Sequence, residues 1–206
     1  MDSKKFSLPE CLALLIFLCG CTALQVAQDV QLGRSALQAG RPEVALGYLG
    51  RAAEIDPNYT LPYTLRESVL TYLGRAYYET GNFAAARRTL EKALARDKGD
   101  SLARLYLGLT LMRDGDPDRG RREAEEGLKG IYNWLENISN IGSSGIFWDP
   151  GRLIRSEIER TLEAKSEPAE FVAAAQRIGR DFDEEVDRAR KDETYTQYGR
   201  TGGGSD

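Results

Sequence analysis

Residues 73–98 read LGRAYYETGNFAAARRTLEKALARDK, and they show the pattern that is repeated along the chain. It contains two glycines seven positions apart, and the same pairing occurs once before it and once after it. A leucine precedes the first glycine each time, in the sets Leu32-Gly33 with Gly40, Leu73-Gly74 with Gly81, and Leu107-Gly108 with Gly115. The first glycines lie 41 and then 34 positions apart. The sequence therefore predicts three related units, with seven additional residues between the first and the second.

Each glycine pair favours a helical hairpin. A glycine in the middle of the first helix lets the second helix approach closely, because it has no side chain. The glycine seven residues later tolerates the left-handed conformation that ends a helix. Small residues are expected on the facing side of the second helix, at Ala45, Ala86 and Gly120. The larger apolar residues between these positions would fill the space across the pair.

The middle unit also has Tyr77, Leu90 and Ala93 at characteristic positions, and it resembles a tetratricopeptide repeat, a helix–turn–helix of 34 residues. The resemblance covers residues 29–98, is weaker up to Gly127 and ends there. It implies an all-α protein, an α-solenoid of about three hairpins over residues 21–130. Proteins built from these repeats bind other proteins, so the resemblance also implies a role in protein–protein interaction.

Helix boundaries follow from the apolar spacing. A buried stripe and the Asp56-Pro57 breaker predict a second helix over residues 42–55. We expect the seven additional residues to lengthen the next helix, so that it begins near Pro62, with a loop insertion as the alternative. Residues 102–112 are apolar on nearly all sides, which predicts a helix buried from several directions. Asp116-Pro117 predicts the start of one long helix that passes the normal repeat end.

Residues 131–193 are expected to cap the array, because a solenoid needs a terminal cover with a polar outer face. A loop over residues 139–149 would lead to Asp149-Pro150, which opens a helix over residues 151–164. A last helix is predicted over residues 166–192. The tail, residues 194–206, is too rich in glycine and polar residues to fold.

The N-terminus has the pattern of an export signal. Lys4 and Lys5 precede the apolar run CLALLIFLCG, which is shorter than the ~20 residues that a spanning helix needs. Its end, residues 18–21 (LCGC), resembles a bacterial lipobox. The resemblance implies a signal peptide over residues 1–20 and a diacylglycerol on Cys21, with palmitate-like acyl chains that anchor the protein in a membrane. The alternative is an uncleaved, buried N-terminal segment.

The residue after that cysteine bears on localisation. By resemblance to enterobacterial sorting, Thr22 at this position favours the periplasmic face of the outer membrane. Few residues separate Cys21 from the first helical stripe, so we expect the repeats to lie close to the membrane surface.

Composition excludes several functions. The net charge is −4, which argues against non-specific nucleic-acid binding. Histidine is absent, and with it the commonest general base and metal ligand. The sequence contains no nucleophile motif, no phosphate-binding loop and no carboxylates at metal spacing. We therefore expect no enzyme activity, no cofactor and no metal site.

By the tetratricopeptide resemblance, one face of each first helix lines the inner surface. This face carries two arginines among apolar and aromatic residues, namely Arg34, Leu37, Thr71, Arg75, Tyr78, Leu109 and Met112. The guanidinium groups could hold an acidic segment, and the apolar residues could receive an amphipathic helix. The alternative is that C-terminal helices cover Leu109 and Met112, while the arginines are merely solvated. The acidic residues Asp183, Glu184 and Asp187 share a face of the last helix, without an evident partner.

Phe147 and Trp148 are two large aromatic residues in a glycine- and serine-rich loop. They could anchor a partner, or they could close the end of the helical array. Two function classes remain. The first is a membrane-tethered scaffold or assembly factor for a cell-envelope complex. The second is a ligand-binding accessory subunit of a periplasmic transport system. An enclosed cavity with convergent polar groups would favour the accessory, and an open groove would favour the scaffold.

Overall fold

The computed structural model describes residues 8–61, 67–140 and 148–201. Within these residues the chain is all-α, apart from an isolated bridge between Thr60 and Ser68. The helices are α1 (Leu8–Gln38), α2 (Pro42–Ile55), α3 (Val69–Glu79), α4 (Phe83–Arg96), α5 (Ser101–Arg113), α6 (Pro117–Ser139), α7 (Leu153–Glu163) and α8 (Pro168–Thr201).

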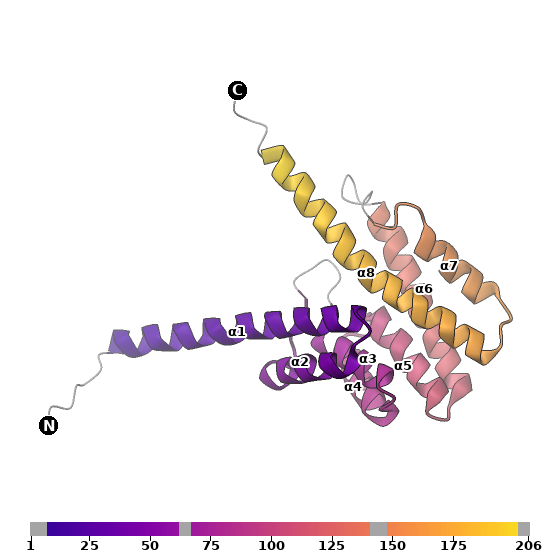
Figure 1. Ribbon diagram of the computed structural model, residues 1–206, viewed down its shortest axis with the longest axis horizontal. Helices are drawn as coiled ribbons and strands as arrows, with labels where there is room; N and C mark the ends of the chain where they lie inside the picture. The colour runs from indigo at the N-terminus through magenta and orange to yellow at the C-terminus, as the bar shows by residue number, and fades with distance from the viewer. Residues whose placement is uncertain (1–7, 62–66, 141–147, 202–206) are drawn as a thin grey trace.

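The helices pack in adjacent pairs. The pairs α1–α2, α3–α4 and α5–α6 form consecutive hairpins, and each stacks on the next, as the repeat pattern predicts (Figure 1). The pair α7–α8 follows at the far end, and α8 runs back across the array (Figure 1). The first part of α1 and the last part of α8 extend beyond the packed body (Figure 1).

The three first-helix glycines lie at tight helix crossings. A Cβ atom added at Gly33 would come within 2.5 Å of Leu49, and one added at Gly74 within 2.5 Å of Leu90. At Gly108 it would meet the backbone of Ala124 and Gly120. The nearest contact therefore lies sixteen positions further along the chain in all three hairpins. The predicted close packing is confirmed.

The hairpin turns also follow the prediction. Gly40, Gly81 and Gly115 all have a positive φ, at 66°, 77° and 93°. This left-handed conformation ends the first helix of each hairpin at little cost for a glycine. The predicted bounds of α2 agree with the structure, and α6 is the single long helix expected after Asp116, whose side chain accepts a hydrogen bond from Arg119 N.

The predicted start of the third helix, near Pro62, is wrong. Helix α3 begins at Val69, and the side chain of Ser68 caps it by accepting a hydrogen bond from Thr71 N. Leu61 N donates to Glu67 O, so the chain turns back on itself before the helix starts. Residues 67 and 68 are therefore not part of the helix, and the rest of the predicted extension, residues 62–66, lies outside the described part of the chain.

Two boundaries in the C-terminal cap are also corrected. Helix α7 begins at Leu153, because Asp149 and Arg152 both have a positive φ and Pro150 lies between them. Asp149 still caps this helix, since its carboxylate accepts hydrogen bonds from Ile154 N and Arg155 N. Helix α8 continues to Thr201, so the expectation that the chain is unfolded from Thr194 is wrong for residues 194–201.

One continuous apolar core joins the repeats to the cap. Helix α5 is buried on nearly all sides, as predicted, with Leu102, Leu105, Tyr106 and Leu109 fully enclosed. It contacts α3, α4, α6 and α8. No helix in the described part of the chain is both long and apolar enough to cross a membrane.

Candidate interaction face

The residues predicted to line the inner face lie on α1, α3 and α5. Six of its seven residues are buried, namely Arg34, Leu37, Thr71, Arg75, Tyr78 and Leu109, and Met112 is half-buried. Arg34 and Arg75 are 0 % exposed. Most of these side chains are therefore not open to solvent.

Helix α8 of the same chain covers the two arginines of this face. Arg34 Nη2 lies 2.6 Å from Asp183 Oδ1, and Arg75 Nη1 lies 3.1 Å from Asp183 Oδ2. Arg34 Nη1 also lies 2.8 Å from Asp187 Oδ1, at the edge of the contact. Gln38 Nε2 donates to Asp187 Oδ2 over 2.9 Å. One buried carboxylate thus bridges the first helices of two repeats.

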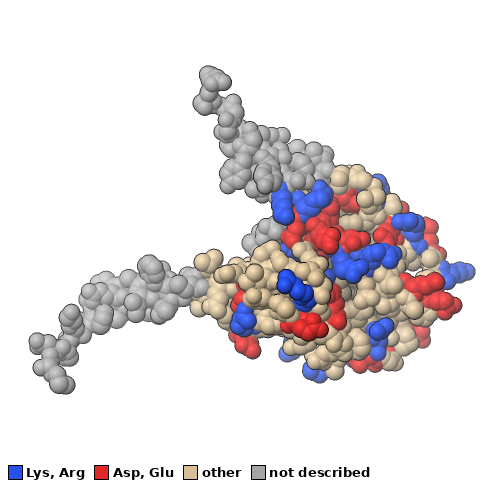
Figure 2. All heavy atoms as spheres, viewed as in Figure 1, with Lys and Arg blue, Asp and Glu red and all other residues tan. Residues whose placement is uncertain are grey.

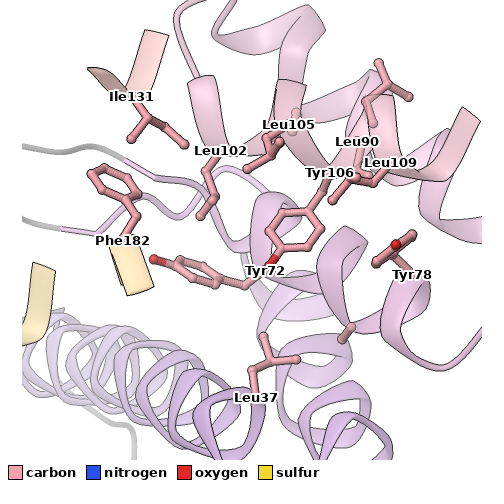
Figure 3. Packing of buried hydrophobic residues seen from close by; sticks show 14 of the residues in the cluster. Leu37, Tyr72, Tyr78, Leu90, Leu102, Leu105, Tyr106, Leu109, Ile131 and Phe182 are labelled. Carbon is pink, nitrogen blue, oxygen red and sulfur yellow. The ribbon is translucent and has the colours of Figure 1, made fainter. Parts of the chain in front are cut away.

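These contacts correct two expectations. The arginines are not solvated, because their charges are met by carboxylates within the protein. The acidic residues of the last helix do have partners, since Asp183 and Asp187 pair with the inner face, whereas Glu184 is exposed. Leu109 is also buried, and it lies beside Leu90 of α4 (Figure 3).

A second buried carboxylate lies beside this bridge. Glu67, just before α3, accepts a hydrogen bond from the hydroxyl of Tyr72, which also donates to Asp183 Oδ1 over 3.1 Å. Burial, together with the nearby charge of Asp183, raises the pKa of Glu67 to about 8. The carboxyl is therefore protonated at neutral pH. Its Oε1 is buried and has no hydrogen-bond partner among the described residues.

Glu67 lines a small cavity between α5, α6 and α8. The cavity has a volume of about 60 Å³, and its lining consists of Glu67, Asp97, Gly99, Asp100, Ser101, Leu102, Ile131, Trp134 and Phe182. Leu102, Ile131 and Phe182 approach one another from these three helices (Figure 3). Asp100 is also buried, and it accepts hydrogen bonds from Thr71 Oγ1 and Ala103 N. Burial raises its pKa as well.

Trp148 belongs to the core. It is 3 % exposed, and its ring lies edge-on to that of Trp134 at 4.8 Å between centroids. Trp134 makes a similar contact with Phe182 of α8 at 5.8 Å. Trp148 thus closes the end of the helical array, the second of its two predicted roles. Phe147 lies outside the described residues.

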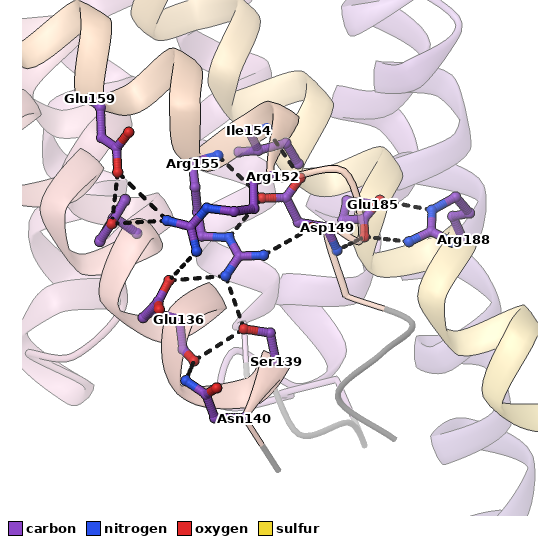
Figure 4. Close-up of polar contacts among 11 residues, drawn as sticks. Glu136, Ser139, Asn140, Asp149, Arg152, Ile154, Arg155, Glu159, Glu185 and Arg188 are labelled. Carbon is purple, nitrogen blue, oxygen red and sulfur yellow. Dashed lines mark hydrogen bonds and ion pairs between the residues drawn. The ribbon is translucent and has the colours of Figure 1, made fainter. Parts of the chain in front are cut away.

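A cluster of polar side chains joins the C-terminal helices α6, α7 and α8 (Figure 4). Arg155 Nε pairs with Asp149 Oδ2 at 2.9 Å, and its Nη1 donates to Glu136 and Ser139 at the end of α6. Asp149 N in turn donates to Glu185 of α8 over 2.5 Å. The cluster links α6, α7 and α8, and its internal pairing indicates a structural role.

The face of the molecule shown in Figure 2 carries charges of both signs. Acidic and basic side chains are interspersed over the described residues of the face shown in Figure 2. Among the residues that the structure describes, no group of three or more Cys, Asp or Glu side chains is arranged to hold a metal ion. Cys21 is a residue of α1, but its side chain is not among those that the structure describes.

Sequence reasoning missed the residues that occupy the face. Asp183 and Asp187 are one helical turn apart, and each follows an apolar residue, Phe182 or Val186. This pattern could have indicated that α8 packs against the two arginines. The cavity had no comparable signal. Its carboxylates come from separate segments, before α3 and before α5, and only the fold brings them together.

Comparison with known proteins supports the repeats. The sequence model of the tetratricopeptide repeat family matches residues 73–133, from within α3 to within α6. No curated protein and no solved structure matches the chain. The second and third hairpins are therefore a tetratricopeptide repeat region.

Proposed function

We propose that the protein is a membrane-anchored scaffold or assembly factor that binds a protein partner of the bacterial cell envelope. The tetratricopeptide repeat region carries this proposal, because such hairpins form a surface for other proteins. The lipobox-like sequence before Cys21 supports the anchor, and Thr22 supports the outer membrane. The repeats would then lie close to the periplasmic face of the bilayer.

The occupant of the inner face suggests what the partner presents. Helix α8 contributes apolar side chains, among them Phe182 and Val186, and carboxylates one turn apart at Asp183 and Asp187. A partner with an acidic amphipathic helix would satisfy the same arginines. We infer that such a helix takes the place of α8 from Asp183 onward, beginning at the partly exposed Asp187.

Chemical crosslinking in intact envelopes tests the proposal. Asp187→Lys places a cation beside Arg34 and weakens the α8 contact at its edge, so the yield of crosslinked partner should rise several-fold. Glu184→Lys, on the exposed face of the same helix, makes the same charge change and should leave the yield unaltered. Adding Arg34→Met to Asp187→Lys should remove the increase in crosslinked partner. The partner helix then lacks the Arg34 cation, whereas Arg75 still pairs with Asp183 of α8. Equal yields from all variants would contradict the competition.

One observation favours a second candidate. The cavity beside Glu67 is small, and the buried polar side chains of Glu67 and Asp100 line it. This arrangement fits a ligand-binding accessory subunit of a periplasmic transport system. Binding of a small molecule without any gain in crosslinked partner for Asp187→Lys would favour this accessory function over the scaffold.

A further inference from the structure

The cavity between α5, α6 and α8 has an unusual charge balance. Three carboxyl groups line it, from Glu67, Asp97 and Asp100, and its described lining contains no lysine or arginine. Glu67 and Asp100 are 3 % and 8 % exposed, so water does little to solvate them. Burial and the nearby charge of Asp183 raise the pKa of Glu67 to about 8. A cation therefore binds here as the Glu67 proton leaves to solvent, and the ionised site is complementary to it.

The side chain of Glu67 gives the strongest evidence for a bound cation. Its Oε2 accepts the hydroxyl of Tyr72, whereas its Oε1 is buried and lacks a hydrogen-bond partner in the described structure. A buried acceptor without a donor costs about 1–3 kcal/mol. The guanidinium groups of Arg34 and Arg75 do not donate to Glu67 Oε1. They are paired with Asp183, Asp187 and Glu79.

The other lining residues distinguish an organic cation from a metal ion. The carboxylates in the described part of the chain do not converge as metal ligands would. The cavity is instead walled by the rings of Trp134 and Phe182 and by the apolar Leu102 and Ile131. Aromatic faces attract ammonium groups, and aliphatic walls accommodate their carbon atoms.

The size and access of the cavity fit a small group. A single water needs roughly 10–15 Å³ of such volume, so about 60 Å³ holds an ammonium group with a short carbon stem. Asp97 and Gly99 are exposed, whereas Glu67 and Phe182 are buried. The exposed residues mark the mouth, and the buried ones mark the inner end.

We propose that this cavity binds an alkylammonium group, with the ammonium against Glu67 Oε1 and its carbon atoms against Trp134 and Phe182. The group could belong to a free amine or to a lysine side chain, which share this chemistry. The inference names the ligand class for the accessory function above and rests on it only for biological context. It does not depend on displacement of α8.

Titration of the full-length chain with methylammonium chloride tests the proposal. The chain has two tryptophans, so the indole region of its ¹H–¹⁵N spectrum has two cross-peaks. The Trp134 peak should move saturably with methylammonium, but not with equal concentrations of potassium chloride or methanol. Above pH 8, where Glu67 is ionised in the folded protein, Glu67→Gln should weaken binding about tenfold or more, since it removes a charge-assisted hydrogen bond. Asp97→Asn at the mouth should weaken it much less.

Further variants and probes complete the test. Phe182→Leu keeps an apolar wall and removes the ring, and it should weaken methylammonium binding several-fold. Tighter binding of N-acetyl-lysine-methylamide than of methylammonium would assign the site to a lysine side chain, and the reverse order would assign it to a free amine. Equal peak movements with potassium chloride, or equal affinity in Glu67→Gln, would overturn the proposal.

Discussion

Arg34 and Asp183 are 149 positions apart in the sequence, yet their side chains meet at 2.6 Å with neither exposed to solvent. The pair joins the first repeat helix to the last helix of the chain. Asp183 also reaches Arg75 in the second repeat, so one carboxylate holds two repeats against α8. Because both partners are buried, removal of either would leave an uncompensated charge in the core. The inner face is thus a closed part of the fold.

Substitution of the repeat glycines should separate tight crossings from open positions. Gly108→Ala places a Cβ against the backbone of Ala124, which cannot rotate away, so we expect a loss of about 3 kcal/mol or failure to fold. Gly74→Ala meets the flexible end of Leu90 and should cost about 1–3 kcal/mol. Urea unfolding measures both.

Gly47→Ala is the matched control. Gly47 lies in the interior of α2 with nothing within 4 Å of an added Cβ. Alanine there should stabilise the protein by about 0.5–1 kcal/mol, because it restricts the unfolded chain and favours helix. A smaller loss for Gly108→Ala than for Gly74→Ala would contradict the backbone contact.

Glu67 should make stability fall as the pH rises. The unfolded chain releases this proton near pH 4.5, whereas the folded protein keeps it until about pH 8. Between these values the folded state binds more protons, so its free energy of unfolding decreases by up to about 1.4 kcal/mol per pH unit. The stabilisation is complete below pH 4.5 and is lost as the pH passes 8.

Unfolding curves from pH 5 to pH 9 measure this effect. Glu67→Gln should flatten the pH dependence and should be more stable than the unaltered protein at pH 8. Glu54→Gln, an exposed position on α2, should leave the slope as it is. The assignment to Glu67 fails if its glutamine variant keeps the full slope.

The helices and turns could be predicted from the sequence more completely than the contacts of the inner face. Glycine spacing and apolar periodicity gave α2, the turns and the length of α6, because these are set by local conformation. The start of α3 was wrong, since the stripe through Leu65 and Val69 fits a helix although the chain turns back before Ser68. The end of α8 was wrong because residues 194–198 contain neither proline nor glycine to stop a helix.

The role of Asp183 could not be predicted in the same way. Its pairing with Arg34 depends on the path by which α8 returns over the array, and no local pattern encodes that path. Likewise, the cavity brings Glu67 together with Asp100 and Phe182 from three separate segments. Local spacing gives helices and turns, whereas the contents of the inner face depend on contacts between distant segments.

Cys21→Ser tests the proposed lipid anchor. The serine hydroxyl cannot take the place of the thiol that receives the lipid, so the variant should move from the membrane to the soluble fraction. Two or more acyl chains would otherwise keep the protein on the bilayer, at about 0.8 kcal/mol per buried methylene. Fractionation followed by detection of the protein measures the change, and a variant that stays on the membrane would contradict the anchor.

The most direct test of the closed inner face is a double-mutant cycle on Arg34 and Asp183, with Arg34→Met and Asp183→Asn measured singly and together by urea unfolding. If α8 is held by this buried pair, the coupling free energy should be about 2 kcal/mol or more. The exposed pair Arg87–Glu91, whose side chains lie 3.1 Å apart, should give about 0.3–0.5 kcal/mol. A coupling for Arg34–Asp183 no larger than that of the exposed pair would contradict the account.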